Sequence, residues 1–316
     1  MSNMRSDFQT IVHRLSWRGL KKLGTLSLLT HLLAMATYVY ASDFHSPRTA
    51  ALGGAGHASP LLNDAILLNP SFAAFLNDRV SAGFSYQNFE APSVDSSTQP
   101  EGEFSGRSYQ VSLQDGRSPL FEAGVAYTRN PVGSSVHIGA ARTFVQQFGF
   151  GVGAKLLFNE ERTVMDPNYS LSITGSLFQE IQFSITADNL INNLGRRSRG
   201  LLEEYTLGTK INIMDLLLFY IDPHYFPDPQ VEQSDWGLEA GVEIVLMNDL
   251  FLRFGRYTNS QIPWILNSGL SANPYGKGYG MGLGWLGPKI SFDFSFARTS
   301  LPFSSSSYNM SATLYL

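Results

Sequence analysis

Between residues 79 and 316 the chain divides into segments of about ten residues in which apolar and polar side chains alternate. Alternation with a period of two residues indicates β-strands whose two faces meet different surroundings. The pattern predicts an all-β fold with fourteen antiparallel strands, at 79–90, 107–115, 120–130, 134–144, 148–162, 168–178, 180–191, 203–214, 216–226, 234–247, 250–260, 277–287, 289–300 and 306–316.

Alternation alone fits two architectures. In the segment 289–300 the apolar face carries Ile290, Phe292, Phe294 and Phe296, and the polar face carries Ser291, Asp293 and Ser295. In a soluble β-sandwich the apolar face would form the core and the polar face would meet water, whereas in a membrane barrel the apolar face meets lipid.

The lengths of the connections favour the membrane barrel. Connections after even-numbered segments are short, at 116–119, 145–147, 179, 215, 248–249 and 288. Connections after odd-numbered segments include the long ones at 91–106, 192–202 and 261–276, although 131–133 is short. Outer-membrane barrels have short periplasmic turns and longer extracellular loops. We therefore expect a transmembrane barrel in a bacterial outer membrane, with both termini periplasmic.

The first 41 residues have the organisation of a secretory signal peptide. Five basic residues precede an apolar run at 23–39, and Val39-Tyr40-Ala41 fits a cleavage site with small residues. The sequence predicts removal of residues 1–41, with a retained membrane anchor as the alternative. No later segment is long and apolar enough to cross a bilayer as a helix.

The charge and the cysteine count exclude several classes of protein. Removing residues 1–41 takes away five of the 22 basic and one of the 26 acidic side chains, which changes the net charge from −4 to −8. An acidic chain of this kind disfavours nucleic acid as a partner, and membrane lipid is the expected one. With no cysteines, the chain has neither a disulfide framework nor a thiolate metal site.

The end of the chain reads as a strand. One face of the segment 308–316 carries Tyr308, Met310, Ala312, Leu314 and Leu316. It looks like the C-terminal strand signal that barrel-assembly machinery reads, except that Leu316 stands where Phe or Trp is usual. The last strand of a soluble domain could look similar.

The segment 42–78 does not alternate. It is rich in small residues, its glycines permit close approaches, and Asn69-Pro70 can begin a turn or cap a short helix. This composition predicts a compact plug. Asn69-Pro70 then has either a structural role as a cap or a functional one as part of a movable gate.

This segment resembles the start of the FadL-type superfamily of outer-membrane proteins, which includes fatty-acid transporters and PorV-like proteins. The matching residues are Arg48, Gly53-Gly54-Ala55, Asp64 and Asn69-Pro70-Ser71, with Ser71 replacing the usual Ala and Leu68 replacing a common aromatic. Looser matches lie at 151–155, 187–190, 237–243 and 252–256. The resemblance implies an N-terminal hatch at 42–78 inside a fourteen-stranded barrel at 79–316.

Fourteen strands enclose more space than their own side chains fill, so the hatch is the expected occupant of the lumen. The charged residues that alternation directs inward are Glu122, Lys155, Asp188, Lys210, Glu239, Glu243, Arg253 and Asp293. We expect them to form networks that hold the hatch or, alternatively, to contact a substrate.

Catalysis finds little support in the sequence. His45, His57, His137 and His224 are scattered without the spacing of metal ligands, and no serine stands out as a nucleophile. We therefore expect no enzymatic activity, no metal and no cofactor.

The loop 261–276 is unusually apolar for an extracellular connection, and we interpret it as a possible entry point for a hydrophobic ligand, formed by Ile262, Trp264, Ile265 and Leu266. It could also fold inward as a cap or pack on neighbouring loops. The leading hypothesis is passive transport of small hydrophobic molecules resembling fatty acids. A non-transporting PorV-like protein that binds or assembles exported proteins, and a purely structural barrel, are the alternatives.

Overall fold

A computed structural model of the chain describes residues 45–76, 79–90, 106–118, 120–130, 133–145, 147–158, 165–178, 180–191, 202–229, 234–247, 249–261, 275–301 and 304–316. The predicted signal peptide at 1–41 lies outside these residues, and so does the predicted entry segment from Ile262 to Leu266. Among the described residues, no helix is both long and apolar enough to cross a membrane.

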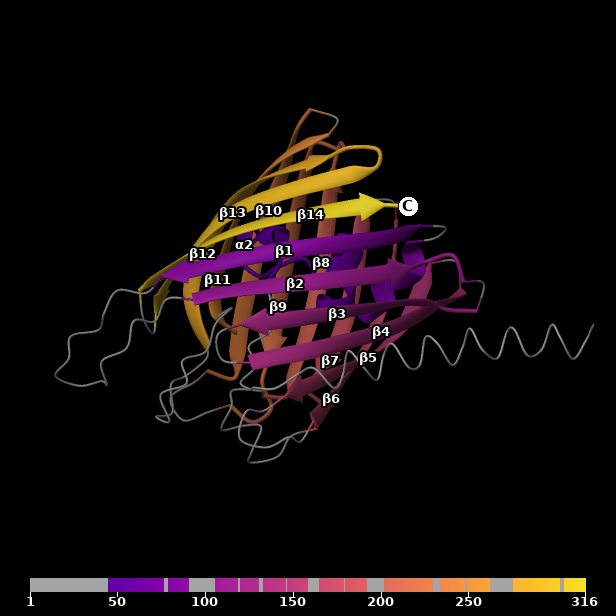
Figure 1. The fold of residues 1–316 in the computed structure, drawn as a ribbon, viewed down its shortest axis with the longest axis horizontal. Helices are drawn as coiled ribbons and strands as arrows, with labels where there is room; N and C mark the ends of the chain where they lie inside the picture. The colour runs from indigo at the N-terminus through magenta and orange to yellow at the C-terminus, as the bar shows by residue number, and fades with distance from the viewer. Residues whose placement is uncertain are drawn as a thin grey trace, which may run out of the picture. The chain divides into compact units, whose positions relative to one another are not determined.

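The described residues form fourteen strands, which are β1 (Val80–Glu90), β2 (Gly106–Asp115), β3 (Glu122–Asn130), β4 (Gly133–Val145), β5 (Phe148–Phe158), β6 (Met165–Ser176), β7 (Ile181–Asp188), β8 (Glu204–Ile213), β9 (Leu217–Tyr225), β10 (Trp236–Met247), β11 (Leu250–Gln261), β12 (Tyr275–Leu286), β13 (Ile290–Leu301) and β14 (Ser305–Tyr315). Each pairs antiparallel with its sequence neighbours, and β1 pairs with β14 to close a barrel (Figure 1). The predicted fold class is confirmed.

The two ends of the barrel sequence meet at one rim. Phe84 of β1 stands opposite Val111 of β2 on one side and Ala312 of β14 on the other. Beyond the last paired residue of β14, the backbone N–H of Leu316 donates to the carbonyl of Val80, at 2.9 Å. The start of β1 and the end of β14 therefore lie side by side at the same rim.

Two strand ends differ from the prediction for a backbone reason. The predicted strand 180–191 stops at Asp188 because Asn189 has a φ of 53°, in the left-handed region that strands do not use. The predicted strand 203–214 stops at Ile213 because Met214 and Asp215 have φ values of 55° and 56°. Two successive residues with positive φ make the tight turn that matches the twist of a hairpin.

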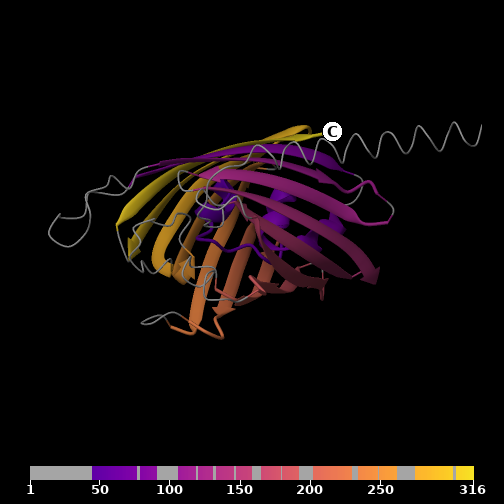
Figure 2. The ribbon, with the colours of Figure 1, turned by 60° about the horizontal axis from the view of Figure 1, so that its bottom comes forward.

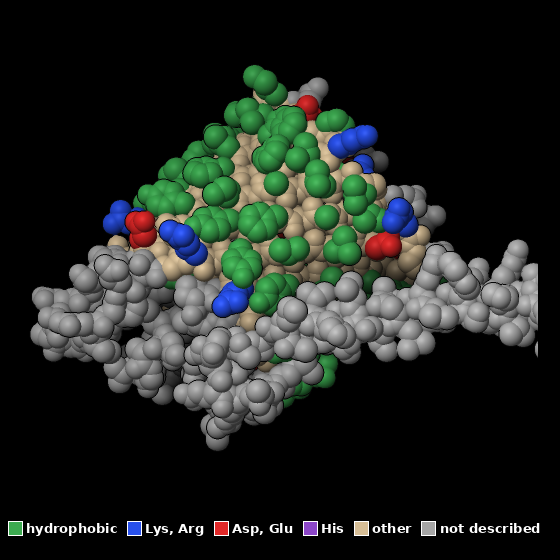
Figure 3. Space-filling view, viewed as in Figure 1, with side chains coloured by type: hydrophobic (Ala, Val, Ile, Leu, Met, Phe, Trp, Pro, Cys, Tyr) green, Lys and Arg blue, Asp and Glu red, His purple; other side chains and the backbone are tan. Residues whose placement is uncertain are grey.

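The exposed face of the barrel is the apolar one, and this decides between sandwich and barrel. Phe84 is 51% exposed and Phe294 54% exposed, whereas Ser85 and Ser295, their neighbours along the same strands, are buried. Figure 3 shows hydrophobic side chains over most of the visible strand surface, with charged side chains toward its margins. A closed sheet with an apolar outside and a polar inside suits a lipid bilayer.

Four short helical elements form the hatch inside the ring of strands, as the indigo segments of Figure 2 show: α2 (Pro47–Ala51), η1 (Leu62–Asp64), α3 (Ala65–Leu68) and η2 (Pro70–Phe75). The hydroxyl of Ser46 accepts from the N–H of Thr49 and caps α2. The Asn69 side chain likewise caps η2 by accepting from the N–H of Ser71, with Pro70 in the first turn. Asn69-Pro70 thus has the structural role of a cap.

Candidate functional site

The interface between the hatch and the barrel wall is the candidate site, and Arg48 of α2 is its main charged anchor. Its Nη2 donates to the hydroxyl of Tyr220 on β9 at 2.8 Å, and its Nε lies 3.4 Å from Oε2 of Glu243 on β10. Nη1 donates to the carbonyl of Ser59 within the hatch. Burial alone would lower the pKa of Arg48, but Tyr220 and Glu243 outweigh it and raise the pKa, so Arg48 stays charged.

Behind Arg48, a chain of alternating charges runs along the wall. The Nε of Arg253 on β11 donates to Glu243 at 2.5 Å, and its Nη1 donates to Asp293 on β13. Glu243 therefore lies between two guanidinium groups, and strands β10, β11 and β13 are linked to the hatch through this one carboxylate. The sequence directs Glu243, Arg253 and Asp293 inward, and the structure brings them together.

Asp64 ends η1, inside the hatch, and links the part of the hatch from η1 to η2 with the part that contains α2. Its Oδ2 accepts from the hydroxyl of Ser46 at 2.6 Å, and from that of Thr49 at 3.4 Å. Burial disfavours the charged carboxylate and raises the pKa of Asp64 to about 6, although Ser46 and Arg48 act in the opposite direction. Asp64 is thus a carboxyl group that gains a proton at mildly acidic pH.

Asn69 and Ser71 attach the other half of the hatch to β6. The amide of Asn69 donates to Thr174 at 2.7 Å, and the N–H of Ser71 donates to the hydroxyl of Ser172 at 2.9 Å. The Ser71 hydroxyl lies 2.7 Å from that of Thr174 and donates to the Asn69 side chain at 2.6 Å. The serine that departs from the alanine of the hatch motif therefore adds hydrogen bonds that an alanine lacks.

Glycines allow the hatch backbone to touch the wall directly. Gly53 has a φ of 67°, and a Cβ there would lie 2.5 Å from the backbone nitrogen of Arg256. On the wall, a Cβ at Gly255 would lie 1.9 Å from the carbonyl carbon of Leu52. Backbone packs against backbone at this point, which only glycine permits.

Asp222 of β9 is a wall anchor that the sequence reasoning missed. Its Oδ2 accepts from the backbone N–H groups of Gly56 and His57, at 2.7 and 2.9 Å, and lies 3.0 Å from Nδ1 of His57. Burial alone would lower the pKa of His57, but the hydrogen bond and charge of Asp222 raise it. The available signal was the alternation of β9, which directs Tyr220, Asp222 and His224 to one face.

The sequence suggested that the histidines are scattered, but two of them lie close together in the structure. His57 and His224 lie with their ring centroids 6.0 Å apart, beside Glu239 of β10. Their separation of more than 160 residues hid this contact, because only the hatch folding back into the lumen creates it.

The remaining predicted lumen charges lie in the wall. Lys155 of β5 donates to Asp188 of β7, and Lys210 of β8 donates to the hydroxyl of Ser59 in the hatch, at 3.3 Å. Glu239 accepts from the hydroxyl of Ser260 on β11. Glu122 is 9% exposed at the start of β3.

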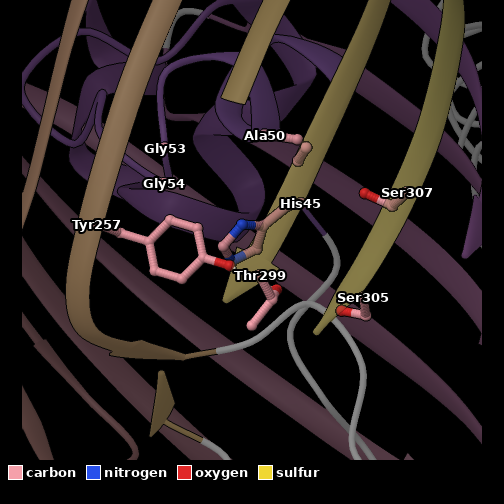
Figure 4. A pocket seen from close by; sticks show the side chains of 9 residues that line it. His45, Ala50, Gly53, Gly54, Tyr257, Thr299, Ser305 and Ser307 are labelled. Atoms are coloured by element: carbon pink, nitrogen blue, oxygen red, sulfur yellow. Dashed lines mark hydrogen bonds between the residues drawn. The ribbon is translucent and has the colours of Figure 1, made fainter. Parts of the chain in front are cut away.

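Two cavities beside the hatch, lined by described residues, are small. One, shown in Figure 4, has a volume of about 10 Å³ between the hatch and β11, β13 and β14, with the Tyr257 hydroxyl 2.6 Å from that of Thr299 and the His45 ring close by. A second, about 20 Å³ in volume, lies among polar side chains including Asp64, Asn63 and Ser112. Each has room for about one water molecule.

A larger groove, of about 450 Å³, lies on the outer face over β11 to β14 and β1. The outward-facing Phe84, Leu283, Phe292 and Met310 are among its lining residues. Hydrocarbon chains of a bilayer match this surface, so the groove belongs to the lipid-facing side and not to the lumen.

Comparison with known proteins shows which fold the chain has. No protein-family model matches the chain, and no curated protein sequence matches it. The CymD monoaromatic hydrocarbon channel superposes with a TM-score of 0.62 at 13% sequence identity, covering 88% of this chain and 99% of that chain. A FadL homologue of Pseudomonas aeruginosa superposes with a TM-score of 0.60 at 11% identity and the same coverage. The toluene transporter TbuX of Ralstonia pickettii gives 0.56 at 10%, covering 86% of this chain and 98% of that one. With its closed fourteen-stranded barrel and internal hatch, the chain has the fold of the FadL-type outer-membrane barrels.

Proposed function

We propose that this protein is a passive channel for small hydrophobic molecules in a bacterial outer membrane, and that its hatch gates the passage. Three solved structures of the same fold are described as a monoaromatic hydrocarbon channel or as toluene transporters, which supports the substrate class. The apolar outer face supports the membrane location, and the predicted signal peptide supports export.

The observation that carries the proposal is a hatch held in the lumen by polar contacts, with two small cavities beside it among the described residues. These cavities of about 10 and 20 Å³ are far smaller than a protein cavity of roughly 150 Å³ that binds benzene. We infer that a hydrocarbon passes when the hatch rearranges. Hydrogen bonds such as those of Ser71 and Asn69 to β6 can break and re-form without covalent change.

A reversible lock on the hatch tests the proposal. The hydroxyl oxygens of Ser71 and Thr174 are 2.7 Å apart, so the pair Ser71→Cys and Thr174→Cys places two sulfurs within reach of a disulfide. The chain has no other cysteine to interfere. We expect liposomes with the reduced double variant to take up labelled toluene, and uptake to fall to the level of empty liposomes after oxidation.

Each result of this experiment has a definite meaning. Matched controls are the single Ser71→Cys and Thr174→Cys variants, which oxidant should leave active. Uptake that continues through the locked protein would contradict gating by the hatch. If the wild-type protein gives no uptake of toluene or of a fatty acid above empty liposomes, the channel function fails. A stoichiometric exported protein recovered with it would then favour the PorV-like role.

We also propose that the ligand enters at the loop 261–276 and that both termini are periplasmic. The apolar residues Ile262, Trp264, Ile265 and Leu266 support the entry point. The alternation of long and short connections supports the orientation, because the start of β1 and the end of β14 share the rim that carries the short turns. Replacing Trp264 and Leu266 with Ser should slow uptake without changing the amount of folded barrel.

A further inference from the structure

A cluster of potential metal ligands lies where the hatch meets β9 and β10. The hatch contributes His57, β9 contributes Asp222 and His224, and β10 contributes Glu239. The side chains of Asp222, His224 and Glu239 are at most 5% exposed, and that of His57 is 13% exposed. Two imidazoles and two carboxylates thus converge in the part of the lumen that the hatch closes off.

The donor atoms already have nearly the separations of a metal site. One ligand atom each from His57, Asp222 and Glu239 lies within 4.8 Å of the others. Nδ1 of His57 is 3.0 Å from Oδ2 of Asp222 and 4.0 Å from Oε2 of Glu239. Two ligands on one tetrahedral zinc ion lie about 3.4 Å apart, given bonds of about 2.0–2.1 Å. Closing the site by this geometry shortens the separations of the donor atoms by at most about 1.4 Å.

Two buried atoms of the cluster face each other in a long ion pair. They are Oε2 of Glu239 and Nε2 of His224, which lie 3.4 Å apart. The other oxygen of Glu239 accepts from Ser260, and the other nitrogen of His224 lies 2.6 Å from Glu204. The two atoms that face the cluster are therefore held by a contact longer than a good hydrogen bond.

The charge of the carboxylates in the cluster is balanced either by protonated imidazoles or by a bound cation. Glu204, Asp222 and Glu239 contribute three carboxylates around two imidazoles, and the side chains of Asp222 and Glu239 are at most 5% exposed. Buried carboxylates require a positive partner or a metal ion. The guanidinium groups of Arg48 and Arg253 contact Glu243 in the same region of the wall, and no interaction between either of them and Glu239 or Asp222 is found among the described contacts.

We propose that His57, Asp222 and Glu239, with His224 as a fourth ligand, bind a divalent transition-metal ion of the zinc class. Imidazole nitrogen with carboxylate oxygen is a donor set that suits Zn²⁺. One ligand belongs to the hatch and three belong to the wall, so the ion joins the hatch to β9 and β10. Glu204 and Thr206 lie against Nδ1 of His224 and orient its ring, as partners behind a metal-bound histidine do.

The site lies close to the turn of the hatch that contains Gly53 and Gly54. A Cβ at Gly54 would lie 2.2 Å from Oε1 of Glu239, so the backbone of this turn rests on the carboxylate. An ion that fixes Glu239 and His57 holds this turn from two directions. The metal thus stabilises the closed position of the hatch, whatever molecule the barrel conducts.

Zinc binding to the intact protein tests the site directly. The protein is purified in detergent without a histidine tag, stripped with a chelator, and titrated with ZnCl₂ by calorimetry. We expect one ion per chain, and at least a tenfold weaker affinity in His57→Gln and in Glu239→Gln. The matched control is His137→Gln, which removes a buried histidine of β4, five strands away from β9, and should leave binding unchanged.

Two further measurements keep the test decisive if a variant folds poorly. X-ray absorption of the zinc-loaded wild-type protein should show imidazole scattering in a first shell of nitrogen and oxygen. Hydrogen exchange of residues 53–59 should slow when zinc is added. The proposal is overturned if zinc does not bind stoichiometrically. It is also overturned if an adventitious ion still binds in both variants, or if His137→Gln loses as much zinc affinity as they do. The cluster would then be a network of protonated histidines and carboxylates.

Discussion

The guanidinium of Arg48 in the hatch contacts the carboxylate of Glu243 on β10, with Nε 3.4 Å from Oε2 and both side chains at most 6% exposed. Removing one partner of a buried pair leaves the other without compensation, which costs about 3–5 kcal/mol. Arg253 also contacts Glu243, which reduces this energetic cost.

Arg48→Ala should therefore destabilise the hatch by about 3 kcal/mol, at the lower end of that range. Faster hydrogen exchange of residues 45–60 in detergent measures the effect. Arg117→Ala is the matched control, because its pair with Asp115 is 59% and 53% exposed and contributes about 0–1 kcal/mol. Equal exchange in the two variants would show that Arg48 does not anchor the hatch.

Ser71→Ala restores the residue that is usual in the hatch motif and removes the hydroxyl that bonds Asn69 and Thr174. We expect a loss of about 1 kcal/mol in hatch stability and no change in the barrel. Urea unfolding monitored by exchange at 69–75 measures it. Ser300→Ala, which removes an exposed hydrogen bond to the carbonyl of Lys277, is the comparison. A Ser71 variant as stable as this control would mean that the extra hydroxyl has no anchoring role.

Gly255→Ala should displace the hatch, because the new Cβ would overlap the carbonyl carbon of Leu52 at 1.9 Å. Gly139→Ala is the control, because its Cβ would lie 3.5 Å from Pro70, an ordinary contact. Single-channel recording in planar bilayers should show a raised ion conductance for Gly255→Ala only. A Gly255→Ala barrel whose ion conductance equals that of the wild type would indicate that the wall or the hatch accommodates the methyl group.

Asp64 makes hatch stability depend on pH. Its pKa is about 6 in the folded protein, above the value of about 3.9 in an unfolded chain, so folding favours the protonated form. The stability it contributes is complete below about pH 4 and is lost as the pH rises through about 6. Asp64→Asn should match the wild type near pH 4 and exceed it by about 1–3 kcal/mol near neutral pH.

Denaturant unfolding across this pH range, in the wild type and in Asp64→Asn, measures the difference. Asp115→Asn is the control, since that carboxylate is exposed at the end of β2. Parallel stability curves for the wild type and Asp64→Asn would rule out the buried carboxyl as the source of the pH dependence.

Local pattern was enough to predict the strands. Faces such as that of Phe292 and Phe294 recur at a period of two, and each strand pairs with its neighbour in sequence, so no long-range contact had to be inferred. The same pattern directs Glu243 and Arg253 inward. It leaves open whether the apolar face meets lipid or a core, and the exposure of Phe84 and Phe294 on the outside of the closed barrel answers that.

The hatch contacts could not be derived in this way. Asp222 binds Gly56 and His57 across more than 160 residues, and no periodicity in either segment encodes that meeting. The predicted strand 216–226 includes Asp222, but its alternation does not indicate that this carboxylate meets the hatch. Backbone approaches such as Leu52 against Gly255 depend on how the hatch folds back, which composition does not determine.

The seam between β1 and β14 also imposes an order on biogenesis. Every other ladder joins strands that follow one another in the chain, so those hairpins can form as synthesis and export proceed. The seam must wait for the final strand, Ser305–Tyr315. The hatch precedes β1 directly, on one edge of a sheet that is still open. Residues 45–76 are thus already present beside that edge, and can fold onto the inner face, when the two edges join.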